Sequence, residues 1–392
     1  MKARKAAPGR GFRVRDRTGN MRDAVLGVTE ETGWSAAEAA AFANPLLDNA
    51  AHYIPASRRS TRLSLLKVRR GDALIGVAPL MVFRRYRATR LLRPELRARF
   101  DPWLGRLTAR TQAWIDPAFL GYAYAPPFVV RDPADLPAVR AAVIAHVQAR
   151  RDIAGLTVTE PAADPATAGL QGFRCVLQLP VVLAVTEGCA SLDDYLARLT
   201  PKRRRNLKAE RDLFARAGGR MQVHPPGGPD TRLIDRMHVL LTNSARANDR
   251  LEVPYAILMN DYPAFRTQRF WSITAHLGDR VAGFFAFIPH GGILHQVHGG
   301  LDYEVGPAVK VYPNLMHAAV AHAIASGARA VSFGPLNNEA KRRAGVALPV
   351  MTGVWVRNPL QRRLLGRVVR HLDAYRGEVP DDIGAGHALR PF

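Results

Sequence analysis

The sequence is poor in cysteine: only Cys175 and Cys189 occur in 392 residues. Two thiols are too few for a disulfide framework or a cysteine-based metal cluster, so these classes of protein are excluded. We therefore expect a reducing compartment, and the default is the cytoplasm.

Long apolar runs are missing as well. No stretch reaches the roughly 18 consecutive apolar residues that a transmembrane helix needs, so we expect no membrane span. Residues 1–20 contain Arg and Lys but no apolar segment, which predicts a disordered basic arm and not a secretory signal.

Lysine is scarce, with seven residues among the 56 lysines and arginines. Arginine therefore supplies most of the formal net charge of +23. Arg and Ala enrichment also follows from GC-rich coding, so the charge alone does not indicate nucleic acid binding, although it does predict attraction to acidic partners. A hydrophobic content of 47% predicts sizeable cores, and the length suits two domains.

The densest run of cations lies in a predicted helix over residues 201–217. Thr200 is a suitable N-cap and Pro201 a suitable first residue, and Gly218 ends the helix. Cations at a helix start oppose the helix dipole, so another reason is needed for them. Phosphates of a nucleotide, coenzyme or RNA are one reason, with Lys202, Arg203 and Arg205 as the contacts; a solvated basic face is the alternative.

The remaining pattern predicts mixed helices and strands in two related halves that divide near residue 180. In the first half we expect a helix over 35–43, strands over 62–68 and 73–83, a helix over 135–150 and a strand over 156–160. In the second half we expect helices over 192–199, 201–217 and 231–248, strands over 269–276, 280–289 and 292–299, a helix over 313–326, strands over 329–333 and 350–356, and a helix over 361–375.

A three-strand meander followed by a helix and a further strand is the order of the GNAT acyltransferase core. Further segments that carry this likeness are residues 74–80, the basic helix, residues 299–303, and residues 332–335 leading to Lys341. Over residues 60–360 the chain resembles the tandem branch of the GNAT superfamily, namely FemABX-like peptidyltransferases and acetyltransferases of the cellulose-biosynthesis (CelD/BcsL) type.

The resemblance implies a mixed α/β fold with two GNAT-like domains in tandem, each a mostly antiparallel mixed sheet flanked by helices. The expected domains are 21–180 and 181–378, between the arm and a tail over 379–392, and the second carries the donor site. It also implies transfer of an acyl or aminoacyl group to the amino group of a small-molecule or peptide acceptor. Aminoacyl-tRNA or acyl-CoA would serve as co-substrate, with no permanently bound cofactor and no metal.

The resemblance also implies functional residues. The lysine that the family keeps after the Phe-Gly strand end corresponds to Lys341, which would stabilise the donor carbonyl or its phosphates. Asp302 and Tyr303 follow the third meander strand, where cleft residues lie, and functional and structural roles both stay open for them. Asn338 lies in a polar loop that is either a turn or a strand end facing the ligand.

The expected coenzyme A loop is altered in this chain. Enzymes that use acetyl-CoA carry Arg/Gln-x-x-Gly-x-Gly/Ala before the helix that follows the meander, and its N–H groups bind the pyrophosphate. Here residues 303–308 read Tyr-Glu-Val-Gly-Pro-Ala, so an acid is added and Pro307 lacks an N–H. Gly306 and Lys310 remain as donor contacts, and aminoacyl-tRNA is favoured over acyl-CoA. Residues 342–347 match the pattern but precede a strand-like stretch, so we interpret that match as coincidence.

Other chemistry is weakly supported by the sequence. His295 and His298 are an odd number of residues apart, so a regular strand points them to opposite faces, which disfavours zinc. No Gly-x-Ser-x-Gly or Walker A pattern occurs. A function of another class also stays open, a non-catalytic GNAT-fold protein that binds nucleic acid or acts as a scaffold.

Overall fold

The computed structural model describes residues 26–32, 61–86, 110–115, 126–161, 169–177, 181–247, 270–335, 345–348 and 350–363, together with residues 35, 38, 42 and 341. The chain forms two compact units. Described residues up to Leu177 and from Met351 onward belong to unit 1, and those from Val181 to Val350 belong to unit 2.

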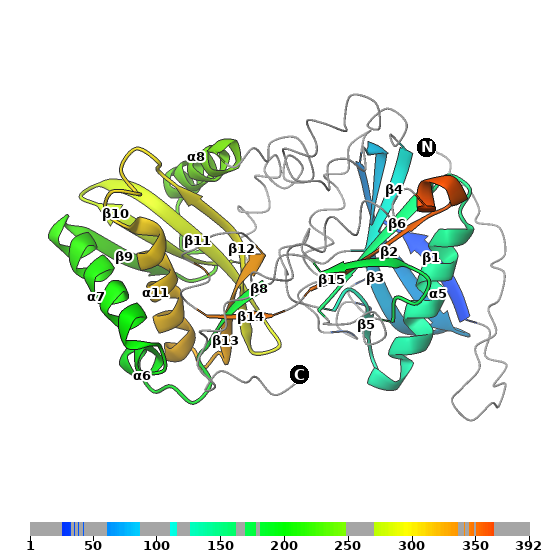
Figure 1. Ribbon diagram of the computed structural model, residues 1–392, viewed down its shortest axis with the longest axis horizontal. Coiled ribbons are helices and arrows are strands. Elements are labelled where there is room, and N and C mark those ends of the chain that lie inside the picture. The colour runs from blue at the N-terminus through cyan, green and yellow to red at the C-terminus, as the bar shows by residue number, and fades with distance from the viewer. Residues whose placement is uncertain are drawn as a thin grey trace. The chain divides into compact units, whose positions relative to one another are not determined.

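Unit 1 is an eight-stranded sheet with one long helix (Figure 1). Its strands are β1 (Leu26–Glu31), β2 (Thr61–Arg70), β3 (Ala73–Tyr86), β4 (Arg110–Ile115), β5 (Val129–Val130), β6 (Gly155–Glu160), β7 (Arg174–Leu177) and β15 (Met351–Val356), and its helices are the short 3-10 helix η5 (Pro133–Asp135) and α5 (Leu136–Ala149). The strand order is β1-β2-β3-β4-β6-β15-β7, and β5 pairs with β3.

Unit 2 is a seven-stranded sheet with helices on both faces. Its elements are β8 (Val181–Val185), α6 (Leu192–Ala197), α7 (Pro201–Arg216), β9 (Gly219–His224), α8 (Thr231–Ala247), β10 (Trp271–Leu277), β11 (Arg280–His290), β12 (Ile293–Leu301), α11 (Val311–Ala325), β13 (Ala330–Pro335) and β14 (Val346–Leu348). The strand order is β14-β8-β13-β12-β11-β10-β9.

The two units repeat one topology. In unit 1 the antiparallel strands β1 to β4 are followed by α5 and then by β6, which lies parallel to β4. In unit 2 the antiparallel strands β9 to β12 are followed by α11 and then by β13, which lies parallel to β12. The mixed α/β class and the tandem arrangement expected from the resemblance are therefore confirmed.

The two units divide after Leu177, and the boundary that we expected lay near residue 180. The expected extent of the second domain is wrong, however, because β15 pairs with β6 and β7 in the sheet of unit 1. The corresponding place beside β13 in unit 2 is taken by β8. An apolar strand pairs wherever an unpaired strand edge and a core are available, and its position in the sequence does not decide which sheet it joins.

The helices of unit 2 begin as their sequences predict. Ser191 and Asp194 form a reciprocal capping box at α6. The side chain of Thr200 accepts a hydrogen bond from the N–H of Arg203 at the start of α7. The expected helices over 35–43 and 361–375 lie largely outside the described residues.

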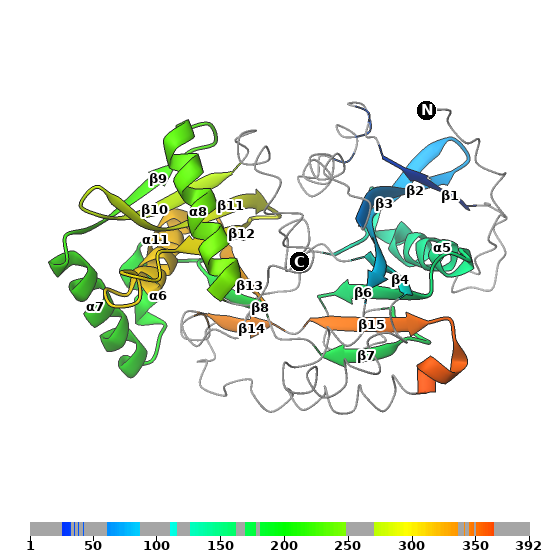
Figure 2. The same ribbon diagram turned by 90° about the horizontal axis from the view of Figure 1, so that it is seen from above.

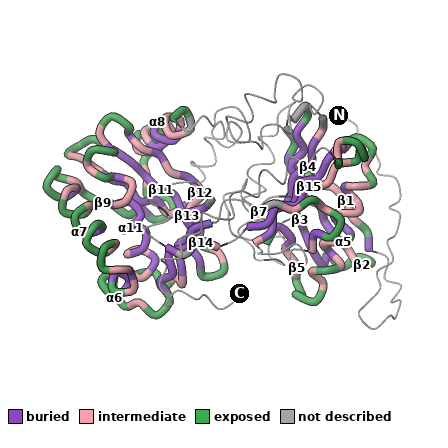
Figure 3. Tube along the Cα trace, viewed as in Figure 1, coloured by how far each residue is buried: buried purple, intermediate pink, exposed green. Residues whose placement is uncertain are grey.

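The two faces of the unit 2 sheet are covered by different helices (Figure 2). Leu207 of α7 and Leu315 of α11 belong to the same core as Phe285 and Phe287 of β11. On the opposite face α8 packs against β12 so closely that a Cβ on Gly300 would lie 2.5 Å from the main-chain carbon of Leu240. Figure 3 shows that β11, β12 and β13 are largely buried, whereas α7 carries many exposed residues. In the described parts of the chain, no helix has the length and apolar character needed to cross a membrane.

Candidate functional site

The sheet of unit 2 opens between its two central parallel strands. β12 and β13 pair through Ile293–Ala330, Leu294–Val331 and His295–Ser332. Both strands continue further, β12 to Leu301 and β13 to Pro335. Beyond His295, the residues of β12 pair with β11 on one side but not with β13 on the other. The facing strand edges can therefore bind an extended ligand through main-chain donors and acceptors.

A bulge in β12 lies at this opening. Phe287 pairs with Gln296 and Ala286 pairs with His298, so Val297 is the extra residue. His295 stands opposite Ile288, which is two residues from Ala286, so His295 and His298 face the same side of the sheet. The expectation that they point to opposite faces is wrong, because it assumed a regular strand.

The register also brings further polar side chains to this face, which is the face that α8 covers. The buried polar residues here are His224, Ser272, Thr274, His295, His298 and Ser332. Burial lowers the pKa of His295 to about 3 and that of His298 to about 4, so both imidazoles are neutral near pH 7. Within the residues that the structure describes, no group of three or more His, Cys, Asp or Glu side chains could hold a metal ion.

Lys341 lies at the end of β13, as its place after the Phe-Gly segment suggested. Its side chain is only 3% exposed, and its ammonium group donates a hydrogen bond to the main-chain carbonyl of Phe333. This carbonyl belongs to the stretch between Ser332 and Pro335 where the pairing of β13 with β8 is irregular and where Gly334 has φ +71°. Lys341 thus brings a buried amino group to the carboxyl end of β13.

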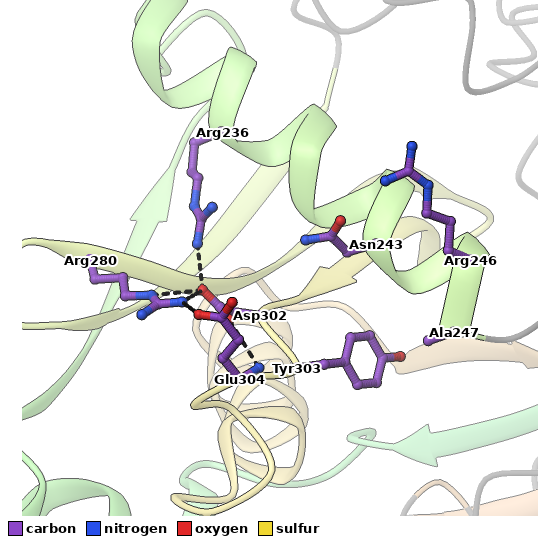
Figure 4. A pocket seen from close by; sticks show the side chains of 8 residues that line it. All are labelled: Arg236, Asn243, Arg246, Ala247, Arg280, Asp302, Tyr303 and Glu304. Carbon is purple, nitrogen blue, oxygen red and sulfur yellow. Dashed lines mark hydrogen bonds and ion pairs between the residues drawn. The ribbon is translucent and has the colours of Figure 1, made fainter.

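Asp302 and Tyr303 line a pocket of about 340 Å³ at the far end of β12 (Figure 4). The other lining residues are Arg236, Asn243, Arg246 and Ala247 of α8, Arg280 of β11, and Glu304. Asp302 is 4% exposed and its Oδ2 accepts hydrogen bonds from Arg236 Nη2 at 2.6 Å and Arg280 Nε at 2.7 Å.

These ion pairs change the interpretation of Asp302. Burial raises the pKa of its carboxyl, but the hydrogen bonds from Arg280, Glu304 N and Arg236 together lower the pKa below its usual value. A carboxylate with a lowered pKa that is held by two guanidinium groups is a weak general base. The geometry therefore favours a structural role for Asp302, whereas Tyr303, which is 42% exposed, remains accessible to a ligand.

The loop before α11 bonds some of its N–H groups internally. Gly306 N donates to Asp302 O at 2.8 Å, and Val311 N donates to Gly306 O at 2.9 Å. Gly306 is buried, Pro307 has no N–H, and Lys310 is an exposed N-cap with φ 59° whose side chain makes no capping bond. These two N–H groups are therefore not directed at a pyrophosphate. The coincidental match over 342–347 runs into β14 and not into a helix.

The cations of α7 lie apart from this loop. Lys202 and Arg205 are exposed and Arg203 is half-buried. The hydrogen bond that joins α7 to the first turn of α11 runs from Asn314 Nδ2 to Glu210 O at 3.0 Å. Because Glu210 is five to eight residues beyond these cations, they lie about 8 to 12 Å further along the helix axis. The start of α7 is therefore separated from the contact between α7 and α11.

Two residues complete the comparison with the sequence prediction. Asn338 lies outside the described residues. Gln296, which the sequence did not single out, lies in the opening opposite Phe287, and its buried Oε1 atom has no hydrogen-bond donor among the described residues. Gln296 differs from other polar strand residues only in its place next to the bulge in β12. A single sequence does not reveal such a bulge.

The geometry of unit 2 agrees with a comparison to protein families. Residues 201–342 match the family model described as an acetyltransferase (GNAT) domain. This match runs from α7 to Lys341 and includes the meander, α11 and β13. Unit 2 therefore carries an acyltransferase domain of the GNAT type. This domain is that of an N-acyltransferase enzyme.

Solved structures that resemble the chain do so at low identity. The crystal structure of FemX is 11% identical, with a TM-score of 0.49, covering 82% of this chain and 98% of that one. L-PGS from Bacillus licheniformis is 11% identical, with a TM-score of 0.48 and coverage of 86% and 97%. A tandem GNAT protein from the clavulanic acid biosynthesis pathway is 14% identical, with a TM-score of 0.39 and coverage of 85% and 99%. No curated protein matches significantly.

Proposed function

We propose that this enzyme transfers an acyl or aminoacyl group to a primary amine, with aminoacyl-tRNA favoured as donor over acyl-CoA. The observation that carries the proposal is the opening between β12 and β13, with Lys341 at its β13 side. A carbonyl compound bound along these strand edges would lie between main-chain donors and a buried ammonium charge. Such fixed donors stabilise the oxyanion that forms in acyl transfer.

The proposed reaction is a direct displacement. The amine nitrogen attacks the donor carbonyl carbon, so a C–N bond forms and the carbonyl oxygen becomes an oxyanion. When the oxyanion collapses, the C–O bond of an aminoacyl ester breaks, and the leaving hydroxyl oxygen takes the proton that the amine loses. Lys341 is proposed to stabilise the oxyanion. The amide oxygen of Gln296 is proposed to accept an N–H from the bound substrates, because it is a buried acceptor without a donor in the described structure.

Two features support a polyanionic donor larger than a coenzyme. In the loop before α11, the N–H groups of Gly306 and Val311 donate hydrogen bonds to carbonyls of the same loop. They are therefore not available to a pyrophosphate. The cations of α7 lie about 8 to 12 Å along the helix from its contact with α11 at Glu210, a separation that a chain of phosphates could span. Lys202, Arg203, Arg205 and Lys310 are therefore proposed as phosphate contacts.

The test compares both donors on the purified full-length chain. Aminoacyl-tRNA charged with labelled amino acids and labelled acetyl-CoA are each offered with a panel of primary amines, and products are identified by mass spectrometry. We expect amide products from aminoacyl-tRNA and at least tenfold weaker use of acetyl-CoA. Acetylated products with no aminoacylated ones would overturn the donor assignment.

The same experiment separates an enzyme from a binding protein. If RNA binds but neither donor yields an amide with any amine, the non-catalytic alternative gains support. Lys341→Ala serves as the matched variant, because loss of product with retained RNA binding assigns the residue to the chemical step.

A further inference from the structure

The pocket at the end of β12 lies just beyond the opening, because Asp302 directly follows Leu301, the last residue of β12. Three elements build it: α8, the start of β11 and the turn after β12. Its volume of about 340 Å³ is at the small end of the range typical of ligand sites. This size suits one ring with a short polar substituent.

The floor of the pocket is a fixed charge network. Besides binding Asp302, Arg236 donates to Val281 O from Nε at 3.1 Å and from Nη2 at 3.0 Å. Arg280 binds Asp302 and also Glu304 Oε2 at 2.6 Å. Asp302 Oδ1 in turn accepts from Glu304 N at 3.2 Å, which fixes the turn that carries the wall. Two guanidinium groups are thus matched by two carboxylates.

A third guanidinium group leaves the pocket with a net positive charge. Arg246 is exposed, and no ion pair to it occurs among the described residues. Asn243 lies one turn earlier on α8, so the two side chains share a side of the helix, as Figure 4 shows. A guanidinium group beside an amide can donate several hydrogen bonds to an oxyanion.

The opposite wall is aromatic. Tyr303 is 42% exposed at the rim, across the pocket from Asn243 and Arg246 (Figure 4). An accessible tyrosine ring can stack on a second planar ring in offset geometry. The pocket therefore combines one unmatched positive charge, an amide donor and a ring surface. These groups are close enough together for one small molecule to contact all of them.

We propose that this pocket binds a small ligand, or the end of a larger one, in which a carboxylate or phosphate group is attached to a planar ring. Arg246 and Asn243 bind the oxyanion, and Tyr303 stacks on the ring. The ion pairs of Asp302 hold the two walls together and take no part in ligand chemistry. The site does not depend on the transferase proposal, because binding requires no reaction. It adjoins the donor loop, since Asp302 O accepts the N–H of Gly306.

The test measures binding of three probes to the full-length chain by ligand-observed NMR titration. Phenyl phosphate and phenylacetate carry the two oxyanions, and phenylacetamide is the neutral analogue of the carboxylate. We expect at least one anionic probe to bind with a Kd on the order of 1 mM and the amide to bind at least tenfold more weakly. The tighter anion identifies the source of the charge as phosphate or carboxylate.

Variants locate the binding. Arg246→Gln should weaken binding of the anionic probe at least tenfold, and Arg246→Lys should weaken it less. Tyr303→Ser should weaken binding of all three probes, because each contains a ring. Arg232→Gln removes another exposed cation of α8 and should leave binding unchanged. Circular dichroism checks the fold of each variant. Equal binding of phenylacetamide and phenylacetate, or unchanged binding in a folded Arg246→Gln variant, would overturn the proposal.

Discussion

Acidification from pH 7.5 to pH 5.5 should destabilise unit 2, because three of its histidines are buried in the neutral form. His295, His298 and His317 are 1%, 6% and 6% exposed, and burial lowers their pKa values to about 3, about 4 and about 4. In the unfolded chain they titrate near pH 6.5. Below that pH the histidines become protonated in the unfolded state but stay neutral in the folded state. The free energy of unfolding is therefore highest above pH 6.5 and decreases as the pH falls.

The size of the loss follows from the two pKa values of each group. At pH 5.5 an unfolded histidine is mostly protonated while the folded one is not, which costs about 1.4 kcal/mol relative to pH 7.5. Three such groups cost about 4 kcal/mol, a large share of the 5–15 kcal/mol typical of a domain. Unit 1 should respond with the opposite sign, because burial raises the pKa of Glu160 to about 7 although Arg140 acts against this. Acidification should stabilise unit 1 by about 2 kcal/mol.

Urea unfolding at pH 7.5, 6.5 and 5.5, read by hydrogen exchange of peptides from β12 and α11, reports on unit 2 alone. In the His298→Gln variant the loss between pH 7.5 and 5.5 should be smaller than in the wild type by about 1.4 kcal/mol. Glu160→Gln, read on peptides of β6, is the control of opposite sign. Identical pH dependence of His298→Gln and wild type would mean that His298 becomes protonated in the folded protein, and the reasoning from burial would fail.

Three further predictions concern single features of unit 2. Lys341→Ala should lower the transfer rate about 100-fold with the fold retained, and Lys341→Arg should restore only part of it; single-turnover rates and a melting curve decide, and a full rate in the Ala variant would contradict the role. Joint replacement of Lys202, Arg203 and Arg205 by Ala should weaken RNA binding and reduce the slope of log Kd against log salt by about 3, whereas an unchanged slope would identify a solvated face. Gly300→Ala should cost about 1–3 kcal/mol in urea unfolding because its Cβ would meet the main chain of α8, and Gly27→Ala, with open space around it, should be nearly neutral.

The sequence predicted the elements whose signals are local. The meander, α11 and the capping box at Ser191 follow from apolar periodicity and cap chemistry within a few residues. It missed the edge strand β9, where only His224 is buried, and it also missed β1, β4 and β8. It also gave β15 to the wrong sheet, because strand pairing depends on partners about 190 residues away.

The candidate site was predicted in part for the same reason. Tyr303 and Asp302 were located correctly at a strand end, but the partners of Asp302 lie 66 residues away on α8 and 22 residues away on β11. No local pattern reveals such ion pairs. The bulge at Val297 likewise reverses the parity of every later residue in β12, so the shared face of His295 and His298 could not follow from spacing.

The repeated topology raises the question of why unit 2, and not unit 1, should bind the donor. In unit 1 the helix that corresponds to α11 is α5, and acids precede it. Asp132 caps η5 by accepting the N–H of Ala134, and Asp135, the N-cap residue of α5, is paired with Arg70 at 2.6 Å. Carboxylates at this helix start already satisfy the dipole and repel phosphate. The start of α11 has no acid in its first turn and follows Lys310.

The strands differ in the same direction. All four residues of β4 from Gln112 to Ile115 pair with β6, and Glu160, at the end of β6, is buried against Arg140 at 3.1 Å. In unit 2 the corresponding strands pair through three residues and then separate. A buried ion pair at the strand end in unit 1 and an opening with a buried lysine in unit 2 are alternative uses of one topology. We infer that unit 1 kept the fold for its core, while unit 2 kept the strand edges that acyl transfer needs.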